Sequence, residues 1–358
     1  MGIPIMKHAS PGYILVLTLL IISASVILVS RLINRSMGNK RQSRLLIDRE
    51  KAKMIALGGL QIAISQLSLL ETTTTAPATT PTTSPAPAPG AAAKPTADQD
   101  QKKLVAKIVE NTNRWQKFIL KEPIDSIDGE LELYISSEAG KINLNSLYNF
   151  NDKKFMVEGT FDAKKIVQLL AEKLKPVLGE SNFAEVLERF LKAHDGPVDD
   201  ITELGALKEF KKIHEQLFIA PTSTFALTDL FTAWGADRDL QPLLISTSLG
   251  SVLGFKKSTQ DAEKLLAERR ELAKKFKTPS SWAQDWDKTL APLYGKEYTN
   301  IPQEIKNLLS TKFEVSYFSV VSYGKIGTIT QKVYAILEKE KTLSDNSTRY
   351  IIKKLYWL

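Results

Sequence analysis

The sequence predicts an α+β protein, in which one long N-terminal helix packs on a small antiparallel sheet and a helical domain is inserted between the strands. Three observations predict this class. An uncharged run near the N-terminus continues directly into an amphipathic stripe. The hydrophobic period then changes from about 3.6 to about 2 residues at residues 129–145, and again after residue 313. Helical and strand-like runs separated in this way are typical of α+β folds.

The uncharged run covers residues 9–30, which contain 22 residues and no charged side chain. As a helix this run would be about 33 Å long, enough to cross a hydrocarbon core of about 30 Å. The alternatives are a cleaved secretory signal peptide and a buried core helix. The apolar region of a signal peptide usually ends after about 7–15 residues. Because this run continues past Ser23, Ala24 and Ser25, we predict a membrane span.

The helical pattern continues past the span without a turn. Residues 42–71 carry an apolar stripe along one helix face, at spacings of 3, 4 and 3: Leu57, Leu60, Ile64 and Leu67. The pair Gly58-Gly59 interrupts the stripe at a cost of about 1 kcal/mol per glycine. We expect one long helix, and the alternative is two helices hinged near Gly38.

The chain has 358 residues, a net charge of +8 and a pI near 9.2. Most lysines lie beside acids, as at residues 338–341, so the excess charge does not predict a nucleic-acid partner. The sequence contains no Cys, which excludes disulfides and thiolate chemistry. A local basic cluster just past the span can meet lipid headgroups: Arg31, Arg35, Lys40, Arg41 and Arg44.

Residues 72–96 contain only Thr, Ala, Pro, Ser and Gly apart from Lys94. Such a segment cannot build a core, so we expect a disordered linker. The helical pattern returns at residues 98–121, and Pro123 ends it. The predicted apolar face of this helix consists of Leu104, Val105, Ile108, Trp115, Phe118 and Ile119.

Alternation of period 2 begins at residues 129–135, where Leu131, Leu133 and Ile135 alternate with polar residues. A turn at residues 137–140 and a second alternating run follow. This pattern predicts a β-hairpin with one buried face.

The C-terminal part predicts three more antiparallel strands, beginning at Phe313, Ile326 and Thr348, with turns at Gly324-Lys325 and Asp345-Asn346. Residues 161–309 lie between the two strand regions. Their amphipathic segments, at 161–178 and 182–194, predict a mostly helical block. Together with the hairpin, the C-terminal strands would form the sheet that lies on the long helix.

The sequence shows no catalytic constellation, so we predict that the protein is not an enzyme. Its densest acidic cluster lies near His194 and consists of Asp195, Asp199, Asp200 and Glu203. Oxygen ligands at such spacings can hold Ca²⁺. There is no EF-hand pattern, however, and solvated acids that cap helices are the favoured interpretation.

The N-terminus resembles that of type IV pilins and type II secretion pseudopilins. These have a short leader that ends in Gly, an uncharged span and an amphipathic extension. The resemblance implies that a prepilin peptidase cuts between Gly12 and Tyr13 and methylates the new N-terminus. Most of the family have Glu as the fifth mature residue, where this chain has Leu17. Members that lack this Glu are chiefly the K-type minor pseudopilins of the general secretion pathway.

The segment at residues 138–145 resembles the K-type family at its most specific point. The matching residues are Glu138, Gly140, Lys141, Ile142, Asn143, Leu144 and Asn145. Residues 225–230 resemble a further family element, while residues 253–265 lack the family's Asn residues. The resemblance divides the chain into a leader (1–12), a helix (13–71), a linker (72–96), a pilin-like helix and hairpin (97–155), an inserted α-helical domain (156–310) and C-terminal strands (311–358).

The resemblance implies a minor pseudopilin at the tip of the type II secretion pseudopilus. Its partners would be other minor pseudopilins, the prepilin peptidase and the bacterial inner membrane. The chain would cross that membrane once, with a cytoplasmic N-terminus and a periplasmic C-terminal domain. The basic cluster after the span would alone favour the opposite topology. The alternatives are a minor pilin of a type IV pilus, and a membrane-tethered adhesin or enzyme with a Thr/Pro stalk.

Overall fold

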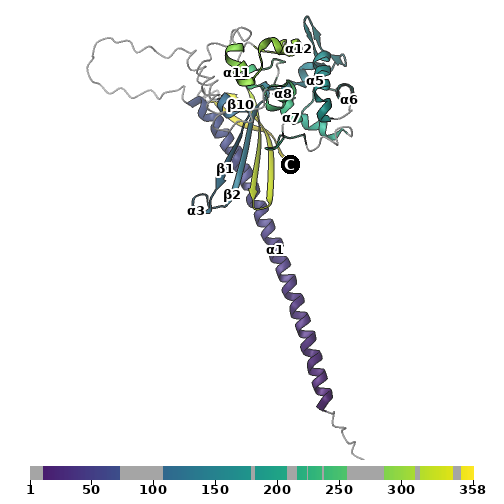
Figure 1. The fold of residues 1–358 in the computed structure, drawn as a ribbon, viewed down its shortest axis with the longest axis vertical. Helices are drawn as coiled ribbons and strands as arrows, with labels where there is room; N and C mark the ends of the chain where they lie inside the picture. Colours follow the sequence, from purple (N-terminus) through teal and green to yellow (C-terminus); the bar gives the residue numbers. More distant parts are fainter. Residues whose placement is uncertain are drawn as a thin grey trace, which may run out of the picture.

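The computed structural model describes residues 11–72, 108–178, 182–207, 216–223, 225–235, 238–255, 286–310, 315–341 and 348–358. Its longest element is helix α1 (Pro11–Thr72), a single helix of 62 residues (Figure 1). The expected long helix is therefore confirmed, and no hinge interrupts it at Gly38. The predicted linker and the turn at Asp345-Asn346 lie outside the described residues.

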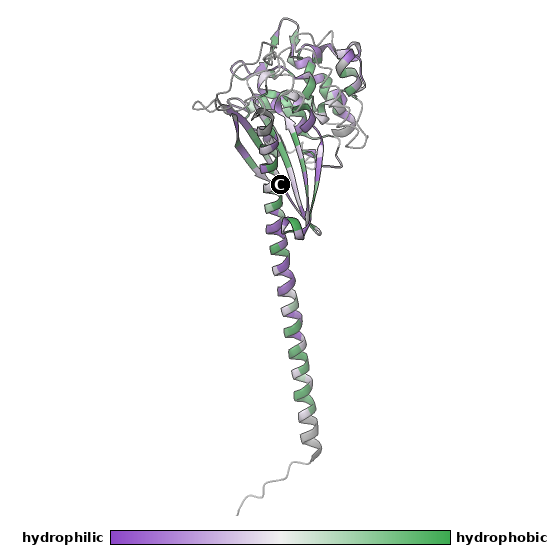
Figure 2. Cartoon of the chain, turned by 90° about the vertical axis from the view of Figure 1, so that its left-hand side faces the viewer, coloured by the Kyte–Doolittle hydropathy of each residue, from purple (hydrophilic) through white to green (hydrophobic). Residues whose placement is uncertain are grey.

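The two halves of α1 have different surroundings. Residues 18–47 are exposed along their whole length, and one window of α1 is long and apolar enough to cross a membrane. Figure 2 shows this apolar stretch in green and a more hydrophilic, purple stretch just below the sheet. The upper half is buried along a face of small and apolar residues: Ala52, Ala56, Leu60, Ala63 and Leu67.

This buried face of α1 covers one side of a five-stranded antiparallel sheet with the order β1-β2-β9-β10-β11. The strands are β1 (Trp115–Leu120), β2 (Gly129–Ser137), β9 (Tyr317–Ile326), β10 (Ile329–Lys341) and β11 (Thr348–Trp357). Strand β9 is central and joins β2 to β10, with Tyr134 paired to Val321 and Val321 paired to Tyr334. The structure thus confirms the predicted α+β class and the three C-terminal strands.

Side chains alternate between the two faces of the sheet. Leu133, Val320 and Ala335 pack in the same cluster as α1. Tyr134, Val321 and Tyr334 pack on the opposite face in a second cluster with Ile219 and Ala226. Strand β2 is therefore buried on both faces in its second half, and not on one face as predicted.

The predicted helix over residues 98–121 is wrong in its second half. Residues 108–111 are helical, and Trp115–Leu120 form edge strand β1. Asn113 adopts a left-handed φ of 56°, which breaks the helix, and its N–H donates to Ile135 O at 2.7 Å. The open edge of β2 then pairs with β1, so tertiary pairing overrides the local helical pattern.

The predicted hairpin at residues 129–145 is also wrong. After β2 the chain forms the 3-10 turn η1 (Glu138–Gly140), and β3 (Ile142–Asn143) leaves the sheet to pair in parallel with β8 (Phe231–Thr232). The turn between β9 and β10 lies at Gly327, with φ of 55°, and not at Gly324-Lys325.

A block of mostly short helices lies between β2 and β9 in the sequence. It sits at the end of the sheet far from the N-terminus of α1 (Figure 1). Among the described residues of the block, the two longest helices, α5 (Ala163–Leu178) and α6 (Phe183–Ala193), confirm the predicted amphipathic segments. The shorter elements are α4 (Leu144–Leu147), β4 (Tyr148–Asn149), β5 (Lys154–Phe155), β6 (Val157–Glu158), β7 (Phe161–Asp162), η2 (Ile201–Ala206), α7 (Leu227–Leu230), η4 (Pro242–Leu244), α8 (Thr247–Val252), η6 (Trp286–Leu290), α11 (Ala291–Tyr294), η7 (Tyr298–Asn300) and α12 (Gln303–Lys306). A further turn of helix, α3 (Glu122–Asp125), connects β1 to β2.

Candidate functional site

The predicted processing site lies in the first turns of α1. The helix begins at Pro11, so Gly12, Tyr13 and Leu17 all lie within it. The side chains of residues 11–17 and the whole of residues 1–10 lie outside the described part of the chain. The structure therefore gives these residues a place in the helix and does not test their roles.

The residues of the family-like motif come together where the sheet meets the block. Lys141 and Glu138 form an ion pair in which both side chains are buried. Besides Glu138, Lys141 Nζ donates to Thr228 O and to Ser319 Oγ, both at 2.7 Å. A lysine ammonium has three donors, and here all three have acceptors. The side chain of Lys141 thus joins turn η1, strand β9 and helix α7.

Gly140 lies in the tightest part of this junction. A Cβ at this position would lie 1.7 Å from the carbonyl oxygen of Leu244, a separation that no side chain can adopt. Its own carbonyl accepts a hydrogen bond from Ser246 N at 3.0 Å. Glycine is therefore required here because η4 packs directly on the backbone of η1.

Asn143 and Asn145 continue the junction into the block. Asn143 caps α4 by accepting from Asn145 N at 3.0 Å, and its amide donates to Gly235 O at 2.9 Å. The side chain of Asn145 donates to the carbonyls of Val198 and Ala233, and it accepts from Val198 N at 2.8 Å. The two Asn side chains thus bond two separate segments, one at Val198 and one at residues 233–235, which is a wider role than the local turn that the sequence suggests.

The sequence did not identify the role of Asp229. Its buried carboxylate accepts from Ser248 N at 2.8 Å and from Tyr134 OH at 3.2 Å. Tyr134 also shares a hydrogen bond of 2.8 Å with Thr247. The only signal was the position of Asp229 in the element at residues 225–230, because its partners lie far away in the sequence.

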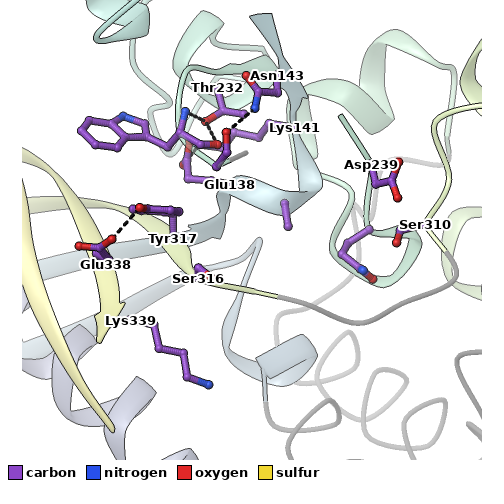
Figure 3. Close-up of a pocket in the computed structure, with 14 residues that line it drawn as sticks. Glu138, Lys141, Asn143, Thr232, Asp239, Ser310, Ser316, Tyr317, Glu338 and Lys339 are labelled. Carbon is purple, nitrogen blue, oxygen red and sulfur yellow. Dashed lines mark hydrogen bonds and ion pairs between the residues drawn. The ribbon is translucent and has the colours of Figure 1, made fainter. Parts of the chain in front are cut away.

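A polar cavity of about 720 Å³ lies beside the junction (Figure 3). Glu138, Lys141 and Asn143 reach it from one side, and Tyr317 and Glu338 reach it from the sheet. Tyr317 OH donates to Glu338 Oε1 at 2.6 Å. The Trp234 ring lies against Tyr317, with ring centroids 5.8 Å apart.

The charges at the sheet side of the cavity stabilise one another. The hydrogen bond to Glu338, together with partial burial, raises the pKa of Tyr317 to about 12. Lys353 lies 2.6 Å from Glu338, and its hydrogen bond and that of Tyr317 lower the pKa of this carboxyl. The Tyr317 hydroxyl, the Glu338 carboxylate and the Lys353 ammonium are thus paired with one another.

The predicted calcium ligands have other partners. Asp200 and Glu203 form a capping box on η2, in which Glu203 accepts from the N–H groups of Asp199 and Asp200. Asp195 is exposed, 3.8 Å from Lys153, and His194 Nε2 lies 3.3 Å from Glu203. Within the described residues, no group of three or more His, Cys, Asp or Glu side chains is placed to hold a metal ion. Asp200 and Glu203 cap η2, as the favoured interpretation predicts, but Asp200 is buried and not solvated.

No protein-family model matches this chain, and the comparison with curated proteins found no match. Among solved structures, one chain of the GspK-GspI-GspJ complex from the enterotoxigenic Escherichia coli type 2 secretion system is similar to it. The two are 14% identical, with a TM-score of 0.36, over 90% of this chain and 99% of that chain. At this identity and TM-score, the likeness alone assigns no function.

Proposed function

We propose that this protein is a minor pseudopilin, a non-catalytic subunit at the tip of the type II secretion pseudopilus. The observation that supports the proposal most directly is the 62-residue helix α1. Its apolar, exposed half continues without a break into a half that is buried on an antiparallel sheet. This arrangement fits a subunit whose long helix is anchored in a membrane at one end and carries a folded domain at the other. We call this folded domain, the sheet and the block together, the head.

Processing by a prepilin peptidase is the first test. The protein would be expressed with an active peptidase or with an inactivated one, and the intact mass of the purified chain would be measured. We expect a mature chain that begins at Tyr13 only with the active enzyme. A chain that begins after Ala24, or that keeps its leader, would contradict the proposal.

Topology is the second test, because the sequence carries a conflict. The five basic residues of the cluster after the span favour a cytoplasmic head by the positive-inside rule. The proposed function requires a periplasmic head, since the leader is cut on the cytoplasmic side. Protease added to spheroplasts should degrade the head while a cytoplasmic control protein survives. A protected head would rule out the pseudopilin role.

The tip position rests on Leu17 and on the block. A Glu at this position would offer a partner to the N-terminal amine of the next subunit, and a carboxylate or amine without a partner is costly in hydrocarbon. A chain with Leu17 cannot offer that partner, and the bulky block would obstruct a further subunit above it. Immunogold labelling should therefore mark one end of each filament. Labels spaced along filaments, or filaments made of this protein alone, would contradict the tip position.

A further inference from the structure

The five-stranded sheet has two free edges, β1 and β11. Strand β11 is the longer of the two and pairs on one side only, with β10. Within the described chain, no backbone hydrogen bond reaches the outer side of residues 351–357. A row of unpaired N–H and C=O groups is a template for a further strand, because only an extended backbone supplies a matching row of partners. The edge therefore fits a strand and not a helix.

The side chains of β11 on the α1 side of the sheet are incompletely covered. Register with β10 places Ile352, Leu355 and Trp357 on the face that α1 covers. They are nevertheless 41% to 46% exposed, whereas the residues that pair with them on β10 are fully buried. A strand beyond β11 would cover these three apolar side chains with its own side chains on the same face.

One flank of α1 lies beside the same edge. Lys53 Nζ lies 5.8 Å from the ring centre of Trp357, and Leu57 and Ile64 lie within about 40° of Lys53 around the helix. Because β11 runs antiparallel to α1, rises of about 1.5 Å per helical residue and about 3.3 Å per strand residue place Leu57 level with Leu355 and Ile64 level with Ile352. Leu57 is exposed and Ile64 is half-buried. We call the five incompletely covered apolar side chains the open flank: Leu57, Ile64, Ile352, Leu355 and Trp357.

The charge of β11 defines the other face of the missing strand. Strand β11 carries three basic residues, Arg349, Lys353 and Lys354, and no acid. Arg349 and Lys353 have carboxylate partners on β10. Lys354 has no carboxylate partner among the described residues: its Nζ lies 5.5 Å from the ring centre of Trp234 and 3.4 Å from Asp199 O. An acidic side chain across the edge from Lys354 would complete an opposite-charge cross-strand pair.

A second copy of this chain does not supply such a strand from either of its free edges. Its β11 would set the same three cations against this β11. Its β1 contains Lys117 and no acid. Like charges that face each other across two strands are destabilising. The occupant of the edge is therefore a different chain.

We propose that the free edge of β11 at residues 351–357 binds an extended segment of a different protein chain as a sixth strand of the sheet. Apolar residues at alternate positions of this segment cover the open flank, and the opposite face carries an acid across from Lys354. A bulge at Lys353 interrupts the register with β10, so the regular part of the edge below it, residues 354–357, sets the register of the occupant. The pairing depends on the sheet edge and not on the membrane anchor, so it goes beyond the proposed function.

The test uses the full chain in phosphatidylcholine nanodiscs and three fluorescent peptides. The strand peptide alternates Val and Glu over about seven residues, and its companion has Lys in place of Glu. The third is the Val–Glu peptide with methylated backbone nitrogens, which lack N–H donors but keep the side chains. Anisotropy measures binding, and hydrogen exchange of the complex identifies the edge. The charge-reversed variant is K354E, and the matched control reverses an exposed lysine of the block, K164E.

We expect the Val–Glu peptide to bind the wild type about tenfold more tightly than the methylated peptide, because only the former can pair along its backbone. Binding should slow amide exchange at residues 351–357 and leave the other free edge, residues 115–120, unchanged. K354E should weaken the Val–Glu peptide about fivefold and favour the Val–Lys peptide, while K164E should change neither affinity. L355S, which alters only the open flank, should weaken both peptides about threefold.

Several results would overturn the inference. The methylated peptide or the Val–Lys peptide could bind the wild type as tightly as the Val–Glu peptide, or residues 115–120 could be protected as strongly as residues 351–357. Protection of residues 351–357 that grows with protein concentration before peptide is added would identify a second copy as the occupant, and tighter binding of a helical Leu–Glu peptide would identify a helix. Binding is read without processing or secretion, so a chain that binds the strand peptide at β11 but keeps its leader would contradict the proposed function alone.

Discussion

The sheet meets the rest of the molecule along two surfaces that are built differently. On one face, α1 packs through small and apolar residues such as Ala52, Ala56 and Ala63. At its far end, the sheet meets the block through apolar side chains and, unlike the contact with α1, through a network of buried polar groups with Lys141 and Glu138 at its centre. We call these the helix seam and the block seam.

The difference shows how each seam specifies its geometry. Apolar contact is non-directional, so the helix seam depends on the close approach that small residues allow. Hydrogen bonds to fixed donors and acceptors are directional, so the block seam orients many short elements that would otherwise have little reason to hold one arrangement. We therefore expect the block seam to be destabilised most by removal of a hydrogen-bonding partner, and the helix seam by added side-chain volume.

The largest effect should follow the loss of the buried cation. Lys141→Met leaves the Glu138 carboxylate buried without its partner, and removal of one partner of a buried ion pair costs about 3–5 kcal/mol. Urea unfolding should show this loss of free energy. Hydrogen exchange should rise at residues 225–235 before it rises in α1.

The double variant E138Q/K141M is the control, because it removes the charge together with its partner. It should regain at least half of the lost free energy. Equal stability of K141M and the wild type would mean that the ion pair does not hold the block seam.

The helix seam should be broken by one methyl group. A Cβ on Gly324 would lie 2.0 Å from the carbonyl oxygen of Ala52, so α1 must move away from β9. Gly324→Ala should cost about 3 kcal/mol, at the upper end for overpacking. Gly58→Ala is the matched control, since a Cβ there meets no atom within 4 Å, and it should stabilise the helix by about 0.5–1 kcal/mol. Equal unfolding midpoints for the two variants would contradict this picture.

Alkaline pH should weaken the block seam. Burial raises the pKa of Tyr323 to about 12, and its OH donates to Ile219 O at 3.2 Å. The folded-state pKa of Tyr323 lies above the ordinary value near 10. The free energy that the neutral Tyr323 hydroxyl contributes to folding is therefore fully present below pH 10, and it is lost as the pH rises toward 12. At about 1.4 kcal/mol per pH unit, the loss should reach roughly 2 kcal/mol.

Tyr323→Phe separates this contribution from that of other groups that titrate at high pH. The variant should be less stable than the wild type at pH 8, and the difference between the two should shrink as the pH rises to 12. A difference that stays constant with pH would show that ionisation of Tyr323 is not linked to folding.

The smallest effect should come from the edge of the cavity. Tyr317→Phe removes one half-exposed hydrogen bond to Glu338 and should cost about 0.5–1 kcal/mol. The pKa of Glu338 should rise but stay below its ordinary value, because Lys353 remains 2.6 Å away. NMR titration of Glu338 measures this shift, and an unchanged pKa would show that Lys353 alone sets it.

Helices and strands that depend on the hydrophobic period of their own segment could be predicted from the sequence. The long helix, α5, α6 and the three C-terminal strands follow from hydrophobic periodicity, and all are present. The motif at residues 138–145 was also identified at the residues that form the junction. The role of this motif could not be predicted, because Lys141 donates hydrogen bonds to acceptors that lie 87 and 178 residues away in the sequence.

Two glycines show why the rest could not be predicted. The sequence predicts an interruption of the helix at Gly59 and a turn at Gly324. In the structure, Gly59 approaches Ser322 and Gly324 approaches Ala52, so both exist to let α1 lie close to β9. Residues Trp115–Leu120 are a third example, because their strand conformation depends on pairing with the edge of β2. Each of these contacts joins residues that are far apart in the sequence, so the hydrophobic period of a short segment cannot predict it.

The order of the strands along the chain also sets the order in which they are synthesised and become available for folding. The face of α1 that ends at Leu67 is covered by β9, which begins at Tyr317, about 250 residues later. At about 5–20 residues per second, a ribosome needs about 12–50 s to make that interval. Until then, only β1 and β2 of the sheet have been made, and the part of the helix face that packs on β9 and β10 stays uncovered. Synthesis that stops within the block would therefore leave an uncovered apolar helix face, the feature that chaperones and proteases recognise in an unfinished chain.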